Sequence, residues 1–360
     1  MLFKLITIIL ATLSRGSASN HYNFPSIYNF GDSNSDTGGG SAAFTAVPPP
    51  NGMTFFGTPS GRRCDGRLII DFIAEQVKLP YLGAYLDSIG ARSFKGGANF
   101  AIGGASIRPG GYSPFNLGVQ ISQFQQFKAR TVDLYNHHDS KVTLPSPEDF
   151  SSALYTFDIG QNDLSFGFQH TTEDQVRASI PDILQHLITT IQQLYNEGAR
   201  VFWVHNTGPH GCLPYSVIYG SKSGNLDPNG CVRSQNEVAQ EFNRQLETLL
   251  TQLETWLPKA MIIYIDVYSA KYALISNAKS QGFVDPMRFC CGSYYECHVD
   301  CGKRVVVNST VYGDACSDPQ AHISWDGIHY SEAANRWVAG LIINGSILDP
   351  QKSTEPAMLH

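Results

Sequence analysis

The chain has 360 residues, of which 42% are hydrophobic and 16% are charged. A chain of this length and composition can bury a large core, which excludes an intrinsically disordered protein. The 31 acidic residues outnumber the 25 basic ones and give a net charge of −6. The basic surplus typical of nucleic-acid-binding proteins is missing, so we expect no nucleic-acid partner.

The first residues have the layout of a secretory signal peptide. Lys4 gives a basic start, residues 5–13 are largely apolar, and residues 16–19 are small. The apolar run is too short to cross a bilayer, which takes about 20 residues, and no later segment is suitable. A buried N-terminal strand is the alternative. We expect a signal peptide over 1–19, a folded domain over 20–349, a tail over 350–360, and a secreted protein of the extracellular space or cell wall, with the vacuole as another destination.

Short apolar runs alternate with segments of helical periodicity along the rest of the chain. Near-continuous apolar strands that alternate with helices indicate a parallel sheet covered on both faces. We therefore predict a single, doubly wound α/β domain, whose ligands bind at the carboxyl ends of the strands. In chain order, the expected elements are a strand at 26–30, helices at 67–77 and 119–134, a strand at 153–159, a helix at 173–197, a strand at 200–205, a helix at 233–256, a strand at 261–267 and a helix at about 331–348.

Three polar or glycine-rich segments follow or separate these strands. Ser33 lies in the Gly-Asp-Ser-Asn turn after the first strand, where a serine can be exposed to a ligand. Gly104 ends a segment of small residues that would let a backbone N–H approach a ligand closely. Asn162 follows the strand at 153–159, and its amide could donate to an oxyanion, although helix capping explains it nearly as well. Each segment alone also fits an ordinary turn.

A fourth segment, near the C-terminus, combines an acid with a histidine. Asp326 precedes His329 by three residues, so its carboxylate can orient the imidazole from behind. An oriented histidine can then act as general base toward a serine that is distant in sequence. The Asp-x-x-His pattern alone is weak evidence, and the other histidines fit surface positions.

Eight cysteines in a secreted chain favour disulfides. We predict that Cys212 pairs with Cys231 and leave the remaining connectivity open. Asn308 and Asn344 fit the N-glycosylation rule. A zinc knuckle is the alternative interpretation of the cysteine-rich segment, and the secreted context and the adjacent Cys-Cys pair argue against it; its ligands would come from Cys290, Cys291, Cys297, His298 and Cys301.

Taken in order, the four segments resemble the four sequence blocks of the SGNH hydrolase superfamily, also called GDSL esterase/lipases, and above all its plant extracellular branch. The resemblance extends from about residue 25 to about residue 344. It implies a single-domain, flavodoxin-like three-layer α/β fold with no metal or organic cofactor. It further implies a Ser33–Asp326–His329 triad and an oxyanion hole formed by Ser33, Gly104 and Asn162. Asn34 departs from the family pattern, which has Leu at that position.

The function implied by the resemblance is hydrolysis of a small-molecule ester through an acyl-enzyme. We expect short-acyl esters, such as acetyl esters of carbohydrates or of glycosylated plant metabolites, in a site walled by loops 41–64 and 215–232. The alternatives are an acyltransferase that uses the same acyl-enzyme, and a non-catalytic binding or defence protein on the same fold. A glycosidase is a further alternative, for which Asp32 and Asp163 would be the two carboxylates. Neither the natural substrate nor the oligomeric state follows from the sequence.

Overall fold

The structure is a computed structural model that describes residues 23–348, apart from Arg92 and residues 136–139, 221–224 and 295–297. The predicted signal peptide and C-terminal tail lie outside the described residues. A five-stranded parallel sheet forms the centre, in the order β2-β1-β3-β4-β5. This is the flavodoxin-like order, in agreement with the fold that the resemblance implies, and it places a switch point between β1 and β3. The strands are β1 (Ile27–Gly31), β2 (Gly97–Asn99), β3 (Leu154–Asp158), β4 (Val201–His205) and β5 (Met261–Ile265).

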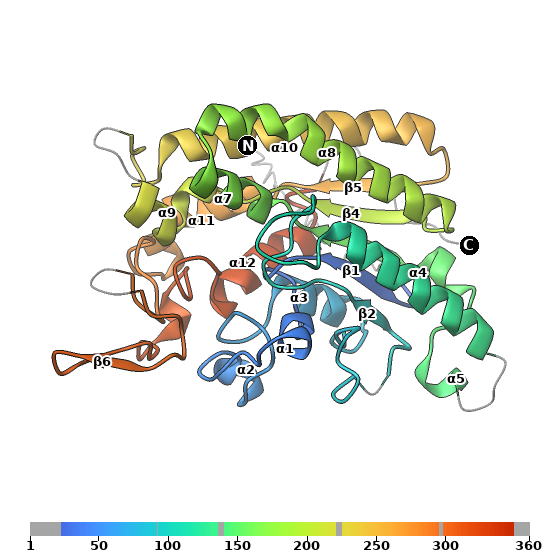
Figure 1. Cartoon of the computed structure of the whole chain (residues 1–360), viewed down its shortest axis with the longest axis horizontal. Helices are drawn as coiled ribbons and strands as arrows, with labels where there is room; N and C mark the ends of the chain where they lie inside the picture. The colour runs from blue at the N-terminus through green and yellow to red at the C-terminus, as the bar shows by residue number, and fades with distance from the viewer. Residues whose placement is uncertain (1–22, 92, 136–139, 221–224, 295–297, 349–360) are drawn as a thin grey trace, which may run out of the picture.

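Helices cover both faces of the sheet (Figure 1). Side chains alternate along each strand, so that Tyr28 and Phe30 pack into one core cluster and Ile27 into the other. The first cluster joins the sheet to α4 (Leu117–Leu134), α8 (Glu173–Asn196) and α10 (Arg233–Trp256). The second joins it to α3 (Ile69–Gln76), α11 (Val267–Ser276) and α12 (Glu332–Ile343). The result is the three-layer α/β architecture that the sequence predicts.

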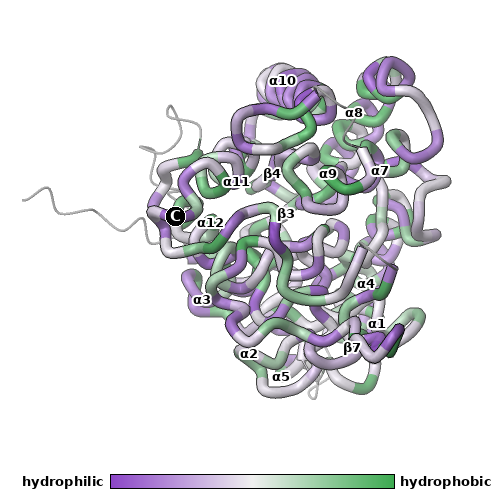
Figure 2. The backbone as a smooth tube through the Cα atoms, turned by 90° about the vertical axis from the view of Figure 1, so that its left-hand side faces the viewer, coloured by the Kyte–Doolittle hydropathy of each residue, from purple (hydrophilic) through white to green (hydrophobic). Residues whose placement is uncertain are grey.

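The long helices form where apolar residues recur every three to four positions. In α10 the buried residues include Val238, Phe242, Leu246 and Leu250, which form one stripe. The rest of the helix is polar, and its end-on view in Figure 2 is largely hydrophilic. None of the described helices is both long and apolar enough to cross a membrane.

The four predicted strands and the first four predicted helices are confirmed to within a few residues at each end. The last helix ends at Ile343, because Asn344 caps it and Gly345 adopts a positive φ of 80°. The sequence analysis missed β2, which is only three residues long, and two helices of ten residues each, α7 (Gln161–His170) and α11. It also missed the hairpin β6 (Val305–Val307) and β7 (Thr310–Tyr312). The remaining elements are short: α1 (Gly39–Ala43), α2 (Met53–Phe56), α5 (Ser140–Thr143), α6 (Asp149–Ser152), α9 (Pro214–Gly220) and the 3-10 turns η1 (His210–Cys212), η2 (Ala278–Gln281) and η3 (Pro319–Ala321).

Disulfides join six of the described cysteines. The predicted Cys212–Cys231 bond is confirmed, and two further bonds join Cys290 to Cys316 and Cys291 to Cys301. The zinc-knuckle interpretation is wrong, because Cys290, Cys291 and Cys301 are consumed by these bonds. Cys64 is a buried free thiol, and Cys297 lies outside the described residues.

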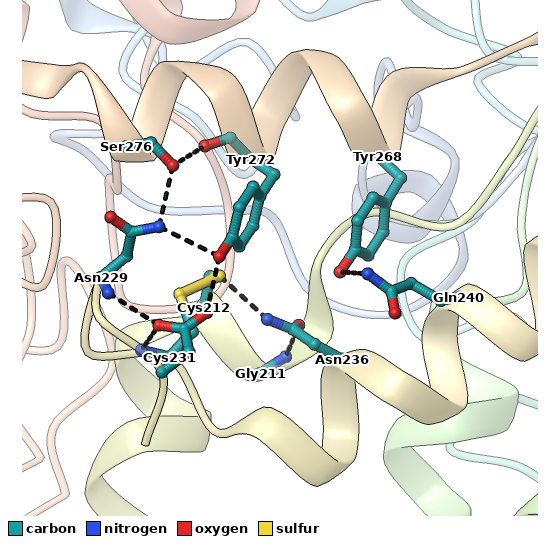
Figure 3. Close-up of a disulfide and its surroundings, with 10 residues drawn as sticks. Gly211, Cys212, Asn229, Cys231, Asn236, Gln240, Tyr268, Tyr272 and Ser276 are labelled. Carbon is teal, nitrogen blue, oxygen red and sulfur yellow. Dashed lines mark hydrogen bonds between the residues drawn. A yellow bond between two sulfur atoms is a disulfide. The ribbon is translucent and has the colours of Figure 1, made fainter.

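The Cys212–Cys231 disulfide closes the loop that carries α9 and connects β4 to α10 (Figure 3). Asn236 of α10 donates to Cys212 Sγ at 3.3 Å and accepts the Gly211 N–H at 2.8 Å. On the other side of the loop, Asn229 bonds to the Tyr272 hydroxyl on α11 at 3.0 Å. The bond therefore fixes this loop between two helices.

Removal of this disulfide is expected to destabilise the fold. The bond spans 19 residues of sequence, and for a loop of this size the lost restriction of the unfolded chain is worth about 3 kcal/mol. We expect the double variant Cys212→Ala/Cys231→Ala to lose about 2–4 kcal/mol of unfolding free energy in a denaturant titration. An unchanged unfolding midpoint would show that the loop is held by its hydrogen bonds alone.

Candidate active site

The structure brings Ser33, His329 and Asp326 into one hydrogen-bonded chain. His329 Nε2 lies 2.8 Å from Ser33 Oγ, and His329 Nδ1 lies 2.7 Å from Asp326 Oδ2. Asp326 Oδ1 accepts the backbone N–H groups of Ile328 and His329 at 3.0 and 2.8 Å, which fixes the carboxylate. The three side chains that the sequence analysis singled out are therefore in contact, although Ser33 and His329 are 296 residues apart.

Ser33 follows β1, at the carboxyl edge of the sheet. The preceding Gly31 must be glycine, since a Cβ there would meet the Asp158 carbonyl oxygen at 2.5 Å. Gln120 of α4 forms two hydrogen bonds with the same strand end. Its amide NH₂ donates to the Gly31 carbonyl at 2.8 Å, and its amide oxygen accepts the Gly31 N–H at 2.9 Å. Gln120 is wholly buried, and the sequence analysis gave no reason to select it. These contacts fix the direction in which the chain leaves β1 and presents Ser33.

The loop that carries Asp326 and His329 is anchored by the cysteine-rich segment. Trp325 is buried against Cys290 and Cys291, and the Cys291 N–H donates to the Trp325 carbonyl at 2.7 Å. The Trp325 indole donates to Asn51 Oδ1 at 2.9 Å, and the Trp325 N–H donates to the His329 carbonyl at 2.8 Å. Two disulfides thus support the Asp-x-x-His turn, which gives this part of the chain a structural role beside the site.

Gly104 and Asn162 lie in the same pocket as Ser33 and His329. Gly104 has a φ of +80°, a conformation that favours glycine. Asn162 is the second residue of α7, and its side-chain amide donates to the Ala105 carbonyl at 2.9 Å. An amide NH₂ has two hydrogens, so one remains for a ligand. The capping interpretation of Asn162 is not what the structure shows, because its recorded bond is to another loop.

Asp36, which the sequence analysis missed, forms hydrogen bonds to both the loop of Ser33 and the loop of Gly104. The Asp36 carboxylate accepts the N–H groups of Gly38, Gly39, Gly40 and Gly103 at 2.6–3.0 Å. These bonds hold the loop after β1 against the loop after β2, beside Gly104. Aspartate followed by glycines was the available signal, since short acidic side chains often accept from the backbone of a following turn.

The electrostatics of the pair Asp326–His329 favour an ionised carboxylate. Burial raises the pKa of Asp326, but the imidazole of His329 and the backbone N–H groups of His329 and Ile328 outweigh burial and leave it below its usual range. The carboxylate is therefore charged at neutral pH. A charged acceptor holds Nδ1 protonated, which leaves Nε2 free to accept the Ser33 hydroxyl proton.

A second group of titratable side chains is buried and does not line the pocket. Asp32, Asp158, His205 and Lys271 are all buried, and His205 Nδ1 lies 3.6 Å from Asp158 Oδ2. Burial and the neighbouring Asp158 raise the pKa of Asp32 to about 8. Burial lowers the pKa of Lys271, while Asp158 and Asp32 act in the opposite direction. Burial raises the pKa of Asp158, but His205 and, to a smaller extent, Lys271 outweigh burial and leave that pKa below its usual range.

The buried carboxyl group of Asp163 predicts that the stability of the fold depends on pH. Its carboxylate accepts the N–H groups of Ile107 and Arg108 at 2.8 and 3.2 Å, and burial raises its pKa to about 6. The folded state therefore holds this proton more tightly than the unfolded state, where the value is 3.8. The resulting stability is present at about pH 4 and is lost as the pH rises through about 6, a change of about 3 kcal/mol.

Asp163→Asn is expected to remove this part of the pH dependence. The unfolding free energy of the variant, relative to that of the wild type, should rise by up to about 3 kcal/mol between about pH 4 and pH 7. Denaturant titrations across this range measure the difference, in which contributions from other groups cancel. A difference that stays constant with pH would mean that Asp163 is ionised throughout.

The pocket has a volume of about 530 Å³ and opens at the carboxyl edge of the sheet. Both loops that were expected to wall the site contribute: Phe44 and Arg63 from the first, and Tyr215 from the second. The other contributors come from the loop before α4, from α7 and from the loops beside the disulfides. They are Gly103, Tyr112, Ser113, Pro114, Gln161, Ser165, Gln169, His210, Leu213, His298 and Ile328.

Comparisons with known proteins show which family the chain belongs to. Residues 27–342 match the family model described as GDSL-like Lipase/Acylhydrolase. The chain belongs to the GDSL lipase/acylhydrolase family. A GDSL esterase/lipase from Arabidopsis thaliana is 51% identical over 98% of this chain and 96% of its own length. GDSL esterase/lipase ACHE from Zea mays is 47% identical over 94% and 89%, and alpha-L-fucosidase 3 from Arabidopsis thaliana is 44% identical over 94% and 95%.

Membership in this family of plant esterases identifies the protein as a carboxylic ester hydrolase, which acts on small-molecule esters. The two carboxylates of the glycosidase alternative do not flank the pocket. Asp32 is buried, and the Asp163 carboxylate already accepts two backbone N–H groups. Neither Asp32 nor Asp163 lines the pocket.

Proposed function

We propose that this GDSL esterase is a secreted serine hydrolase in which Ser33 is the nucleophile, His329 the general base and Asp326 the residue that orients His329. The observation that carries the proposal is the 2.8 Å contact between His329 Nε2 and Ser33 Oγ. That distance lies within the reach at which a base accepts the proton of its nucleophile. The complete triad argues against a non-catalytic binding protein on the same fold.

In the proposed reaction, His329 takes the Ser33 proton as Oγ attacks the ester carbonyl. The Ser33 and Gly104 N–H groups and the Asn162 amide hold the resulting oxyanion, and each such donor is typically worth about 2.7–4 kcal/mol. His329 then gives its proton to the departing alcohol, which leaves the acyl group on Ser33. Water, activated by His329, releases the acid and restores the enzyme. An alcohol in place of water would give acyl transfer by the same route.

The substrates we propose are short-acyl esters, above all acetyl esters of carbohydrates or glycosylated metabolites. The pocket walls carry aromatic rings, including Phe44, Tyr112 and Tyr215, which offer flat apolar surfaces to sugar rings. Amide side chains on α7, Gln161 and Gln169, offer hydrogen bonds to hydroxyl groups. The mixture of aromatic and polar groups supports a sugar ester over a long aliphatic chain.

The proposal includes secretion, with the signal peptide and the glycosylation sites that a secreted protein carries. We propose a signal peptide over 1–19, a hydrolase domain over 20–349 and a tail over 350–360. Three disulfides in the described part of the chain support an oxidising compartment. Asn308, at the turn of the β6–β7 hairpin, and Asn344, after α12, are exposed, as glycan acceptors must be.

The test is hydrolysis of p-nitrophenyl acetate, butyrate and palmitate by the secreted protein, followed by acid quench and peptide mass analysis. We expect acetate and butyrate to react fastest, and an added acyl mass on the peptide that contains Ser33. Fast hydrolysis of palmitate would contradict the acyl preference. An acyl group found on another residue would contradict the role of Ser33. Product analysis with added alcohols separates hydrolysis from acyl transfer.

A further inference from the structure

Arg63 lies in the pocket wall beside Ser33. A Cβ built on Gly103 would lie 3.4 Å from Arg63 Nε and 3.7 Å from Ser33 Cβ, so the guanidinium and the serine flank the same glycine. Gly103 and Gly104 line the pocket together with both residues. The Arg63 side chain is thus close to the ester that Ser33 would attack.

The neighbouring arginines are engaged in the fold, whereas Arg63 is not. Arg62 is buried and forks onto the Asp71 carboxylate at 2.6 and 2.8 Å. Arg67 pairs with Glu75 at 2.9 Å and with Glu332 at 2.6 Å. Arg63 is exposed and has no recorded ion pair or side-chain hydrogen bond with another residue of the described chain. Its five N–H donors therefore remain available to a ligand.

No carboxylate among the described pocket residues balances this charge. Arg63 is the one formally charged residue in the lining, which otherwise holds three histidines and no Asp or Glu. Asp36, whose Oδ2 would lie 3.7 Å from the same Cβ built on Gly103, does not line the pocket; it is buried and already accepts four backbone N–H groups. The pocket therefore carries positive charge although the chain has a net charge of −6.

We propose that Arg63 binds a carboxylate carried by the ester substrate, so that the preferred substrates are anionic esters, such as acetylated sugar acids or half-esters of dicarboxylic acids. A guanidinium fork matches a carboxylate in a bidentate geometry, which fixes orientation as well as charge. Because the fork lies next to the reacting serine, binding the carboxylate also positions the ester. This inference rests on the proposed role of Ser33 and adds the substrate class.

The experiment compares matched neutral and anionic esters. p-Nitrophenyl butyrate and the p-nitrophenyl half-ester of succinate differ by a carboxylate on the acyl side. Acetylated galactose and acetylated galacturonate differ by a carboxylate on the alcohol side. We expect Arg63→Gln to lower the anionic-to-neutral ratio of kcat/KM about tenfold in at least one pair, and Arg63→Lys to restore part of it. The ratio is independent of any general loss of activity, and high salt should weaken it in the wild type.

Arg130→Gln is the matched control, because it removes the same charge from an exposed position on α4 that does not line the pocket. It should leave both ratios unchanged. A response confined to the succinate pair places the carboxylate on the acyl group, and a response confined to the galacturonate pair places it on the alcohol; either supports the proposal. Ratios unchanged by Arg63→Gln in both pairs would overturn it. Absence of Ser33-dependent hydrolysis of the neutral esters would instead overturn the proposed function.

Discussion

Ser33→Ala is expected to lower kcat for ester hydrolysis about 10⁴- to 10⁶-fold while the protein remains folded. Each tenfold loss corresponds to about 1.4 kcal/mol of transition-state stabilisation, so the effect amounts to about 5–8 kcal/mol. In the proposed mechanism Ser33 Oγ forms the acyl-enzyme, and the variant lacks this atom. His329 Nε2, 2.8 Å away in the wild type, would then be left without its partner. Steady-state hydrolysis of p-nitrophenyl acetate measures the loss.

The proposed triad also predicts how the effects of substituting its members combine. If Ser33 and His329 act as one unit, the double variant Ser33→Ala/His329→Ala should be no slower than either single variant. Asp326→Asn should retain the geometry but stabilise the wrong imidazole tautomer, with a loss of about 10⁴-fold in kcat. Losses that multiply in the double variant would indicate two independent roles. Retention of substantial activity in Ser33→Ala would remove Ser33 as nucleophile.

Lys271→Met is expected to destabilise the fold by about 3–5 kcal/mol, although Lys271 is absent from the pocket lining. The Lys271 side chain is buried, with its ammonium 4.5 Å from the centre of the Tyr330 ring, and together with His205 it stabilises the charged Asp158 carboxylate. Methionine has a similar shape but no charge, so the variant would remove one of the two groups that compensate this buried carboxylate. Denaturant unfolding at neutral pH measures the loss.

A double-mutant cycle separates the charge from the packing. Asp158→Asn removes the carboxylate that Lys271 balances, so adding it to Lys271→Met should recover part of the lost stability. Recovery of at least about 1 kcal/mol relative to the sum of the single effects would establish the coupling. Strict additivity would show that Lys271 stabilises the fold through its aliphatic chain and the Tyr330 ring rather than through its charge.

Much of the architecture could be predicted because its signals are local. The buried strands β1, β3, β4 and β5 are short apolar runs, and the long helices show one-sided periodicity. β2 escaped prediction because Gly97, Ala98 and Asn99 have weak strand preferences, and this segment is a strand only because it pairs with Ile27–Asn29 of β1. The α7 helix escaped because it begins with polar residues that suggest a turn.

The residues of the four motifs could be selected from the sequence, since each stands at a strand end or in a recognisable short pattern. The residues that hold them in place could not. Gln120 and Asp36 act through backbone groups 89 and 67 residues away. The glycines after Asp36 were a signal for its local bonds, but its bond to Gly103 and the bonds of Gln120 have no sequence signature, because the partner is a main-chain group that any residue supplies. The same reason hides the contact between Asn162 and the Ala105 carbonyl.

The sequence by itself determined the α/β class and the family, and it allowed Ser33, Gly104, Asn162, Asp326 and His329 to be selected as candidate site residues, because these depend on periodicity and short motifs. Tertiary structure alone decided the 2.8 Å approach of His329 to Ser33 and the exclusion of Asp32 and Asp163 from the pocket. It also decided that, of three nearby arginines, Arg63 faces the pocket while Arg62 and Arg67 form ion pairs within the fold. Burial and charge compensation are properties of neighbours brought together by folding, and the order of residues along the chain does not reveal them.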